Sequence, residues 1–493
     1  METFLGLDIG TSSTKGVLVT ASGTVLAQAV REHTVGRPEA GRVEMEGTLW
    51  WDELVSIAAE LLSTTDESPR AIGLSGMGPC VLLTDGENRP VAPAALYGVD
   101  TRATAQIDEL NEQLGADAIF ETCDSHLSTQ SGGPKLRWFA AHMPEVYASA
   151  RRFHMPASYL VARLTGEYVL DRQSASQTTP LYDATTQEWH TDWCDVVAPG
   201  ITLPRLAWAG DVAGTVTPAA AHAVPGLRPG TPVVVGTIDA WAEGLSVGAV
   251  SAGDLMLMYG TTLFLIGTTA HRVRHPSMWG TTGLSAREWN LAGGMATSGA
   301  ITGWLRDLFG TPSYGDLVAE ARNSGPGSRG LLMLPYFEGE RTPIQDPHAR
   351  GTVTGLTISH TRGDLYRAAL EATAFGVRHN IETFRDAGVE VSRVVAVGGG
   401  TRGSLWPQIV SDVTGLPQEV RRVTVGASYG DAFLAARAVG LDVDIAEWNP
   451  IETTIESRPH PAYENHYALY RDLYESTRDI QHALAAEHYG HRD

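Results

Sequence analysis

The sequence contains one local pattern twice, and this repetition constrains the fold more than any other feature. Residues 4–9 are apolar and strand-like, residues 10–13 (Gly-Thr-Ser-Ser) have turn chemistry, and residues 17–20 resume a strand. Residues 254–266 pass in the same way from a strand, through a Gly-Thr-Thr turn, into a second strand. One copy in each half of the chain fits a duplicated core.

Strand and helix signals alternate through both halves of the chain. The clearest are an apolar strand at residues 393–397 and two helices, near residues 49–62 and over residues 364–385. Such alternation is typical of the α/β class. Because 493 residues are too many for one compact core, we predict two domains, residues 1–245 and residues 246–493, the second of which ends in a helical tail.

Composition limits the kinds of partner that the protein can have. With 36 basic and 57 acidic residues the net charge is −21, which opposes binding to nucleic acid or to an anionic membrane. No apolar run approaches the roughly 18–20 residues that span a bilayer, and the N-terminus has no secretion signal. The three cysteines, Cys80, Cys123 and Cys194, are widely spaced and indicate a reducing compartment. We expect a cytoplasmic protein with a small-molecule substrate and no nucleic-acid or membrane partner; a homodimer is left open.

The first repeated turn has the residues of a phosphate site. A carboxylate at a strand end, such as Asp8, can hold hydrated Mg²⁺ while the amides and hydroxyls of the Gly10-Thr11 turn face phosphate oxygens. The chain has only two lysines, Lys15 and Lys135. Lys15 follows on the returning strand and can neutralise a phosphoryl oxygen. Read alone, an ordinary hairpin with an aspartate near its turn is the commoner explanation.

The second repeated turn, Gly260-Thr261-Thr262, can supply another set of amides and hydroxyls for phosphate. By itself it is also explained by a plain hairpin. Two such turns, one in each half, can hold a triphosphate from two sides. The pair therefore indicates a phosphate-handling protein more strongly than either turn does.

A glycine run after a predicted strand supports two different readings. Gly398, Gly400 and Gly403 satisfy G-x-G-x-x-G, and Glu419 lies about 20 residues on, where a dinucleotide site has an acid for the ribose. This pattern predicts a dinucleotide-dependent oxidoreductase. Against that reading, only one further strand and one clear helix follow before the polar tail. The run Gly398 to Gly400 equally allows the adenosine of ATP to lie close to the backbone.

Two polar positions are candidates for substrate chemistry. Asp239 follows an apolar strand one element before the second turn, where a carboxylate can accept a hydroxyl proton during phosphoryl transfer. A helix N-cap is the alternative for an Asp in that position. Asp100 and Arg102 can clamp sugar hydroxyls, although a surface salt bridge between them is the default explanation.

Taken together, these segments resemble the FGGY family of carbohydrate kinases, within the actin, hexokinase and Hsp70 superfamily. The resemblance runs from about residue 5 to about residue 440. Its most specific part is the run Gly351-x-Val353-x-Gly355-Leu356, followed after seven residues by a run that begins at Asp364 and ends at Glu371. The other matching segments are Pro134-Lys135-Leu136-x-Trp138, Pro156-x-x-Tyr159-Leu160, Gly339-Glu340-Arg341-Thr342-Pro343, and Gly398 to Gly400 with Trp406 and Asp412.

The resemblance implies two ribonuclease-H-like (actin-like ATPase) domains that flank a cleft, with the sugar on the N-terminal domain and ATP on the C-terminal one. It assigns Mg²⁺ to Asp8 and the catalytic base to Asp239. It assigns the phosphates and adenosine of ATP to Gly10, Thr11, Ser12, Lys15, Gly260, Thr261, Thr262, Gly398, Gly399 and Gly400.

The sugar pocket departs from the best-known members of the family. The run Gly76-Met77-Gly78-Pro79-Cys80 stands where xylulokinases have a Gln-Met-His-Gly run, and Pro79 takes the place of the His. Overall spacing is nearest to xylulokinase, so a ketopentose such as xylulose is the first expectation, with ribulose, glycerol, a tetritol or gluconate as alternatives. We expect the sugar to contact Met77, Tyr97, Asp100, Arg102, Asp239 and Trp241.

Overall fold

The computed structural model describes residues 2–490, which form two compact units. The first unit contains the chain up to Val250 together with two later segments, Ala270–Asn290 and Val425–Pro450. The second unit contains Ser251–Thr269, Leu291–Thr424 and the chain from Ile451 onward. The division into a sugar-binding and an ATP-binding domain near residue 245 stays a prediction.

The first unit is built on a twisted sheet whose strand order is β13-β14-β5-β1-β2-β3. Strands β1, β2 and β3 form antiparallel pairs, whereas β5 runs parallel to β1 and β14 runs parallel to β5. A short strand, β15, also pairs in parallel with β5. The bounds are β1 Thr3–Ile9, β2 Ser13–Thr20, β3 Val25–Glu32, β5 Ala71–Gly76, β13 Val212–Thr215, β14 Pro232–Val234 and β15 Thr237–Ile238.

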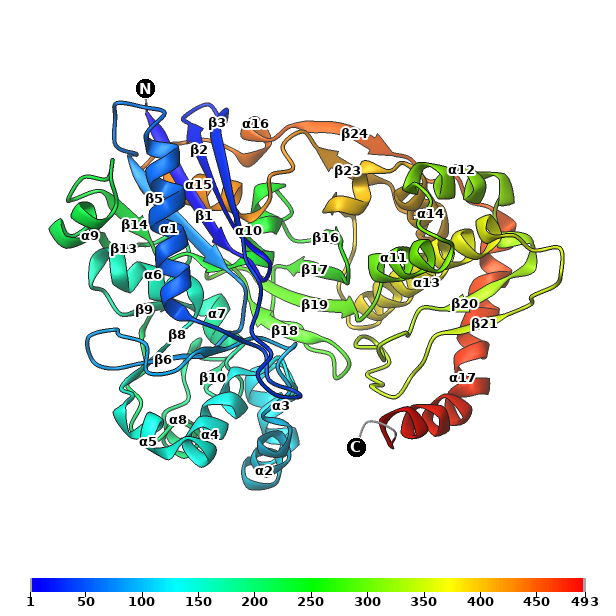
Figure 1. The fold of residues 1–493 in the computed structure, drawn as a ribbon, viewed down its shortest axis with the longest axis horizontal. Coiled ribbons are helices and arrows are strands. Elements are labelled where there is room, and N and C mark those ends of the chain that lie inside the picture. The colour runs from blue at the N-terminus through cyan, green and yellow to red at the C-terminus, as the bar shows by residue number, and fades with distance from the viewer. Residues whose placement is uncertain (1, 491–493) are drawn as a thin grey trace. The chain divides into compact units, whose positions relative to one another are not determined.

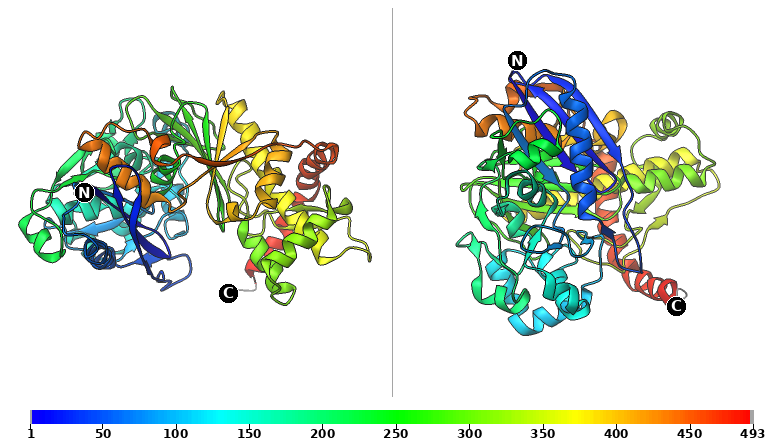
Figure 2. Two further views of the ribbon diagram at one scale, coloured as in Figure 1. Left: turned by 90° about the horizontal axis from the view of Figure 1, so that it is seen from above. Right: turned by 60° about the vertical axis from the view of Figure 1, so that its left-hand side comes forward.

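Helices α1 (Gly47–Leu62) and α15 (Ala427–Ala438) cover opposite faces of this sheet. Gly16 on β2 faces α1, where an added Cβ would lie 2.4 Å from Ile57, whereas Gly6 on β1 faces α15. Because α15 comes from a segment near the end of the chain, the first unit is completed only late in the sequence. Figure 1 labels both helices, and Figure 2 shows the orange α15 beside the blue strands.

The second unit repeats the topology of the first. Its sheet contains, in order, β19, β17, β16, β22, β23 and β24. β16 and β17 are antiparallel, and β22 and β23 continue the sheet in parallel with β16. This matches β3-β2-β1-β5-β14 strand for strand, so the duplicated α/β core predicted from the two turns is confirmed. The bounds are β16 Asp254–Tyr259, β17 Leu263–Thr269, β19 Trp289–Met295, β22 Arg393–Val397, β23 Gln418–Arg421 and β24 Ile451–Ile455.

The predicted amphipathic helix at residues 364–385 is α13, which extends over Arg362–Asp386. It begins two residues early because Thr361 and Asp364 form a capping box, in which each side chain bonds the backbone N–H of the other residue. The other helices of the second unit are α11 Gly299–Leu308, α12 Tyr314–Ser324, α14 Leu405–Thr414 and α17 Pro461–Gly490, and its small hairpin pairs β20 Leu332–Leu334 with β21 Thr352–Thr354.

Within the described residues, no helix is both long enough and apolar enough to cross a membrane.

The rest of the first unit is mainly helical between residues 101 and 166, as the sequence predicts. The helices are α2 Thr104–Leu114, α3 Ala116–Cys123, α4 Gly132–His142, α5 Pro144–Ser149, α6 Pro156–Thr165, α7 Arg172–Ser176, α8 Thr191–Val197, α9 Pro218–Ala223, α10 Asp239–Ser246 and α16 Ile445–Trp448. The short strands are β4 Glu44–Met45, β6 Leu82–Thr84, β7 Ala94–Ala95, β8 Arg152–His154, β9 Val169–Asp171, β10 Tyr182–Asp183, β11 Glu188–Trp189, β12 Arg205–Ala207 and β18 Trp279–Thr282.

Candidate active site

Three parallel strands of the first unit end at the same edge of the sheet and bring two predicted site residues together. Asp8 on β1 is in register with Ser75 on β5, and Ser75 is in register with Thr237 on β15. Asp239 follows Thr237 after one residue and is the first residue of α10. Ligands of open α/β sheets bind at the carboxyl ends of such strands. The edge therefore places Asp8 and Asp239 where a ligand site is expected.

Asp239 is not a helix N-cap. The N-cap of α10 is Ile238, which makes no side-chain cap bond, and Asp239 Oδ1 accepts a hydrogen bond of 2.7 Å from the N–H of Ala240. The carboxylate thus sits in the first turn, where the helix dipole favours a negative charge. The cap interpretation is wrong for this residue.

Burial and crowding raise the pKa of each carboxyl group at this edge. Burial raises the pKa of Asp8 to about 6, although Lys15 and Ser75 oppose the shift. Burial and then repulsion from Asp8 raise the pKa of Asp239 to about 7. Burial and Asp8 also raise the pKa of Glu243, one helical turn further along α10, to about 7. Such shifts are typical of groups that exchange protons near neutral pH.

Asp431 on α15 is a fourth acid of this cluster, and the sequence analysis did not find it. Its side chain is fully buried, and burial followed by repulsion from Asp8 raises its pKa well above the usual value. The Ser75 hydroxyl lies 2.7 Å from Asp431 Oδ2 and 3.2 Å from Asp8 Oδ1, and so links the two acids. Neither Ser75 nor Asp431 carries a motif, so no sequence signal could have found them.

The first predicted phosphate turn lies next to this cluster. The N–H of Gly10 donates to the carbonyl of Ser13 at 3.0 Å and closes the turn between β1 and β2. Lys15 stands directly opposite Asp8 on β2, which puts both side chains on one face of the sheet. The Thr11 hydroxyl lies 3.0 Å from the Tyr97 hydroxyl. A residue predicted to bind phosphate is thus in contact with a residue predicted to bind the sugar.

The proposed sugar residues Asp100 and Arg102 are bonded to each other and are buried. Arg102 Nε and Nη2 contact the Asp100 carboxylate at 2.7–3.0 Å, and Arg102 Nη2 also contacts Glu44 at 2.8 Å. The guanidinium lies over the ring of Trp138 at 4.9 Å. The expectation of a surface salt bridge is wrong in its location, because the two side chains are at most 1% exposed.

Three other predicted positions lie in the same unit. Met77 is buried at the end of β5. Trp241 is buried on α10, and its indole N–H donates to Asn290 Oδ1 at 2.9 Å. Lys135 is almost fully buried, and burial lowers its pKa to about 8 against the opposing effect of Asp100. Its ammonium donates to the carbonyls of Thr129 and Ser131.

A cavity of about 890 Å³ lies within the second unit, at the ends of β16 and β22. Gly260 and Thr261 of the second turn line it together with Gly399, Gly400 and Trp406. The volume lies within the range typical of small-molecule sites. Both sequence motifs predicted for ATP in this half therefore border one cavity.

Gly398 allows the glycine run to lie on the end of β16. Its φ is +91°, and an added Cβ would lie 2.4 Å from the carbonyl oxygen of Tyr259. Gly398→Ala should therefore displace the run and weaken ATP binding by about tenfold or more, since both the strain and the collision must be relieved. Titration calorimetry with ATP measures the effect. Gly86→Ala is the control, because nothing lies within 4 Å of its added Cβ and Gly86 does not line this cavity; equal affinities for the two variants would contradict this reading.

The dinucleotide reading of this glycine run finds no support in the structure. Glu419, the acid expected to contact the ribose, makes ion pairs of 3.0 Å with Arg393 and with Arg421. The carboxylate is therefore committed to two guanidinium groups of its own sheet.

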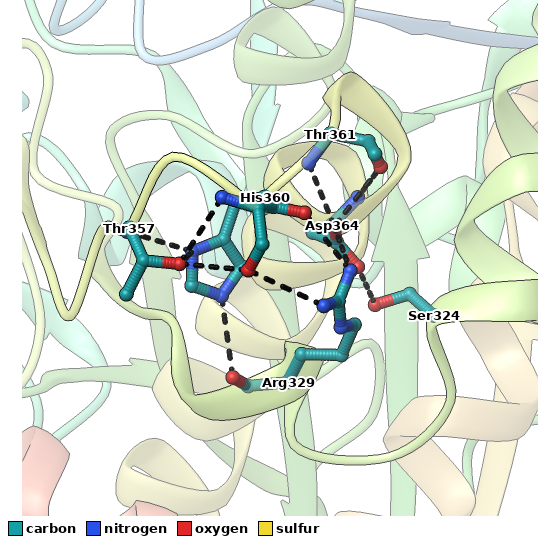
Figure 3. A network of polar contacts seen from close by, with 7 residues as sticks. Ser324, Arg329, Thr357, His360, Thr361 and Asp364 are labelled. Carbon is teal, nitrogen blue, oxygen red and sulfur yellow. Dashed lines mark hydrogen bonds and ion pairs between the residues drawn. The ribbon is translucent and has the colours of Figure 1, made fainter.

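The most specific sequence motif, around Gly351 to Glu371, contributes Tyr366 and Leu370 to the lining of the cavity in the second unit, whereas its acidic residues form a structural network. Asp364 accepts hydrogen bonds from Ser324 at 2.7 Å and Thr361 at 2.7 Å and pairs with Arg329 at 3.3 Å, as Figure 3 shows. Glu371, further along α13, accepts a bond of 2.8 Å from Ser328. The network fixes the connection between α12 and β20 onto α13.

The segment Gly339 to Pro343 has a comparable structural role at the end of β19. Glu340 Oε1 accepts a bond of 2.7 Å from Ala296, and burial raises the pKa of Glu340 to about 8. Thr342 accepts from the N–H of Gly294 and donates to Asn380 on α13, both at 2.6 Å.

The donor set for a metal ion is sparse. Among residues 2–490 no group of three or more His, Cys, Asp or Glu side chains is arranged to hold a metal. Mg²⁺ needs no such cage, because it keeps several waters and is usually held by one or two carboxylates and substrate phosphates. The buried carboxylate of Asp8 beside the phosphate turn fits that requirement.

The duplicated fold and the paired turns are those of a phosphate-handling α/β protein, and comparison with known families identifies the class. The chain matches the N-terminal domain of the FGGY family of carbohydrate kinases over residues 3–245 and the C-terminal domain over residues 255–439. The chain belongs to this family. It is therefore a phosphotransferase that acts on carbohydrate hydroxyls, and kinases of this family use ATP as the phosphate donor.

Individual relatives cover almost the whole chain. A xylulose kinase from Escherichia coli (strain K12) is 28% identical over 98% of this chain and 99% of its own length. A glycerol kinase from Nocardia farcinica is 31% identical over 88% of this chain and 89% of its own length. The crystal structure of a xylulose kinase from Rhodospirillum rubrum superposes with a TM-score of 0.90 at 31% identity and covers 98% of this chain and 100% of that one.

Proposed function

We propose that this protein transfers the γ-phosphate of ATP to a hydroxyl of a ketopentose such as xylulose. The observation that carries the proposal is the pair of buried Asp8 and partly buried Asp239 at the carboxyl edge of the first sheet, with a phosphate turn and Lys15 beside it. The similarity to the xylulose kinases of E. coli and R. rubrum supports xylulose as the first substrate to test.

Asp239 is proposed as the base. Because burial and Asp8 raise its pKa to about 7, the carboxylate can take a proton from a sugar hydroxyl near neutral pH and can release it afterwards. The attack on the γ-phosphate then depends on positioning and on charge stabilisation. The amides and hydroxyls of Thr11 and Ser12, in the turn that begins at Gly10, are proposed to bind with Lys15 the oxygens of the phosphoryl group while it passes from ATP to the sugar.

The proposal assigns the sugar to the first unit and the nucleotide to the second. Met77, Tyr97, Asp100, Arg102 and Trp241 are proposed to form the sugar pocket with Asp239. Of these, Tyr97 has the strongest support, because its hydroxyl contacts Thr11 of the phosphate turn. Asp100 and Arg102 are bonded to each other, and we propose that they support the wall of the pocket instead of clamping a hydroxyl directly.

The adenosine and phosphates of ATP are proposed to occupy the cavity lined by Gly260, Thr261, Gly399 and Gly400. Thr262 and Gly398 belong to the same two loops. Asp8 is proposed to hold Mg²⁺, which would neutralise phosphate charge there when bound.

The substrate can be identified by ADP release, measured with a coupled assay at fixed ATP and Mg²⁺. We expect the highest kcat/KM with xylulose in a panel that also contains ribulose, glycerol, a tetritol and gluconate. The 31% identity to a glycerol kinase makes glycerol the most important competitor in the panel. A higher kcat/KM for another member of the panel would identify that compound as the preferred substrate in place of xylulose. The absence of ADP release with every sugar would contradict the proposed activity.

A further inference from the structure

A histidine behind the first phosphate turn bonds the turn in two places. His33 follows β3, and its backbone N–H donates to the carbonyl of Ser12 at 3.0 Å. Its ring nitrogen Nε2 lies 3.0 Å from the carbonyl oxygen of Gly10. The other ring nitrogen, Nδ1, lies 2.9 Å from Oε2 of Glu53 on α1. The ring is only 5% exposed and thus joins α1 to the turn.

The partners of the ring determine its protons. A carbonyl oxygen can only accept a hydrogen bond, so Nε2 must carry a proton to bond Gly10. Nδ1 faces the Glu53 carboxyl group, which also accepts a bond of 2.5 Å from the Thr14 hydroxyl at Oε2. The ring is therefore a donor to Gly10 and is held on its other side by Glu53.

The bond to Gly10 orients the peptide that begins the phosphate turn. In a trans peptide the C=O and the following N–H point in opposite directions. Because the Gly10 carbonyl is held toward His33, the N–H of Thr11 points away from the ring. Backbone N–H groups presented together in a turn are a common way of binding phosphate.

We propose that His33, held by Glu53, is a positioning residue that turns the Thr11 N–H toward the phosphate of ATP. The inference rests on the proposed function of the Gly10 turn. Loss of the Nε2 donor should loosen the turn, because the Gly10 carbonyl would then lose the hydrogen bond that holds it.

Two charged side chains near the ring have different partners. The Glu53 carboxylate on α1 faces the ring and also accepts a bond from the neutral Thr14 of β2. Arg31, two residues before His33 on β3, is directed to Glu60 at 2.6 Å and to Ser56. The positive charge of Arg31 is therefore already paired with another carboxylate.

Two amide variants separate the two bonds of the ring. In His33→Gln the amide nitrogen can reach the position of Nε2, whereas in His33→Asn it reaches only the position of Nδ1. Each variant keeps one of the two side-chain bonds of the ring, so the two should have similar melting temperatures. At saturating sugar, we expect H33Q to retain kcat/KM for ATP within about threefold of wild type. We expect H33N to lose about tenfold or more, because the Gly10 carbonyl is left without its hydrogen-bond partner.

A second histidine variant tests whether the loss of any histidine has this effect. His142→Asn is the control, because His142 also contacts a backbone carbonyl, that of Trp138 at 3.1 Å, but on α4. This variant should match the wild type in kcat/KM for ATP.

The outcomes separate the inference from the function on which it rests. If the wild type phosphorylates a sugar but H33N and H33Q lose activity equally, or neither loses it, the positioning role is overturned. A loss in H142N equal to that in H33N also overturns it. If the wild type releases no ADP with any sugar, the proposed function fails, and the inference about catalysis fails with it.

Discussion

Asp239→Asn should lower the turnover number by about three orders of magnitude, within the roughly 10²–10⁴-fold that a general base contributes. Asparagine keeps the size of the side chain and an acceptor oxygen for the Ala240 N–H, which lies 2.7 Å from Oδ1 in the wild type. It cannot accept the proton of a sugar hydroxyl. ATP binding should remain nearly intact, because the nucleotide is assigned to the cavity of the second unit. Steady-state kinetics and ATP titration calorimetry measure the two quantities.

The control for this variant is another aspartate in the first turn of a helix. Asp117 occupies that position on α3 and is exposed. Asp117→Asn should leave turnover unchanged. Turnover of D239N close to that of the wild type would show that Asp239 is not the base, whereas a matching loss in both variants would indicate a nonspecific effect of the substitution.

The pH profile of the wild type provides a second check on the same residue. Asp239 must be ionised to act as a base, and burial together with repulsion from Asp8 raises its pKa to about 7. As the pH falls through 7 the carboxyl group becomes protonated, so kcat/KM should decrease toward acid pH. The acid side of this profile should be much flatter in D239N.

The fold could be predicted from the sequence because its two halves carry the same local signal. Each strand, Gly-Thr turn and strand has clear turn residues, and both became the centre of an equivalent sheet. The sequence does not predict which segment of the chain supplies the helix on the second face of the first sheet. Helix α15 lies at residues 427–438 but packs on β1 and β5 of the first unit, and no periodicity in the sequence states which sheet a helix covers.

The candidate site was predictable only where a residue stood in a recognisable motif. Asp8, Lys15 and Asp239 were found through the paired turns and the family resemblance, and the structure gathers them at one edge of the first sheet. Ser75 and Asp431 lie in plain strand and helix sequences, and they join the cluster only through tertiary packing. Their roles depend on distances that a linear sequence does not contain.

The network in Figure 3 shows that one motif can serve both the fold and a cavity. In the run around Gly351 to Glu371, Asp364 and Glu371 bond the backbone and side chains of neighbouring loops. Tyr366 and Leu370, on the helix between these two acids, line the cavity of the second unit. The segment around Met77 lies at the end of β5 beside the proposed site.

Gly73→Ala should destabilise the first unit by about 3 kcal/mol or more, a large effect for the addition of one methyl group. Gly73 lies on β5, and an added Cβ would stand 1.9 Å from the carbonyl oxygen of Asp431 on α15. Backbone atoms cannot rotate away as a side chain can, so the helix must move off the sheet. The shift would also pull Asp431 from Ser75, and activity should fall with stability. Denaturant unfolding of the full chain, followed by circular dichroism, measures the effect.

Gly86→Ala serves as the control, because nothing lies within 4 Å of its added Cβ. Its free energy of unfolding should differ from that of the wild type by no more than roughly 1 kcal/mol, the effect of a glycine-to-alanine change where the backbone allows it. If G73A unfolds at the same denaturant concentration as G86A, then α15 does not pack against β5 as described. The late segment Val425–Pro450 would then not complete the first unit, and the assignment of Asp431 to the acidic cluster would fall with it.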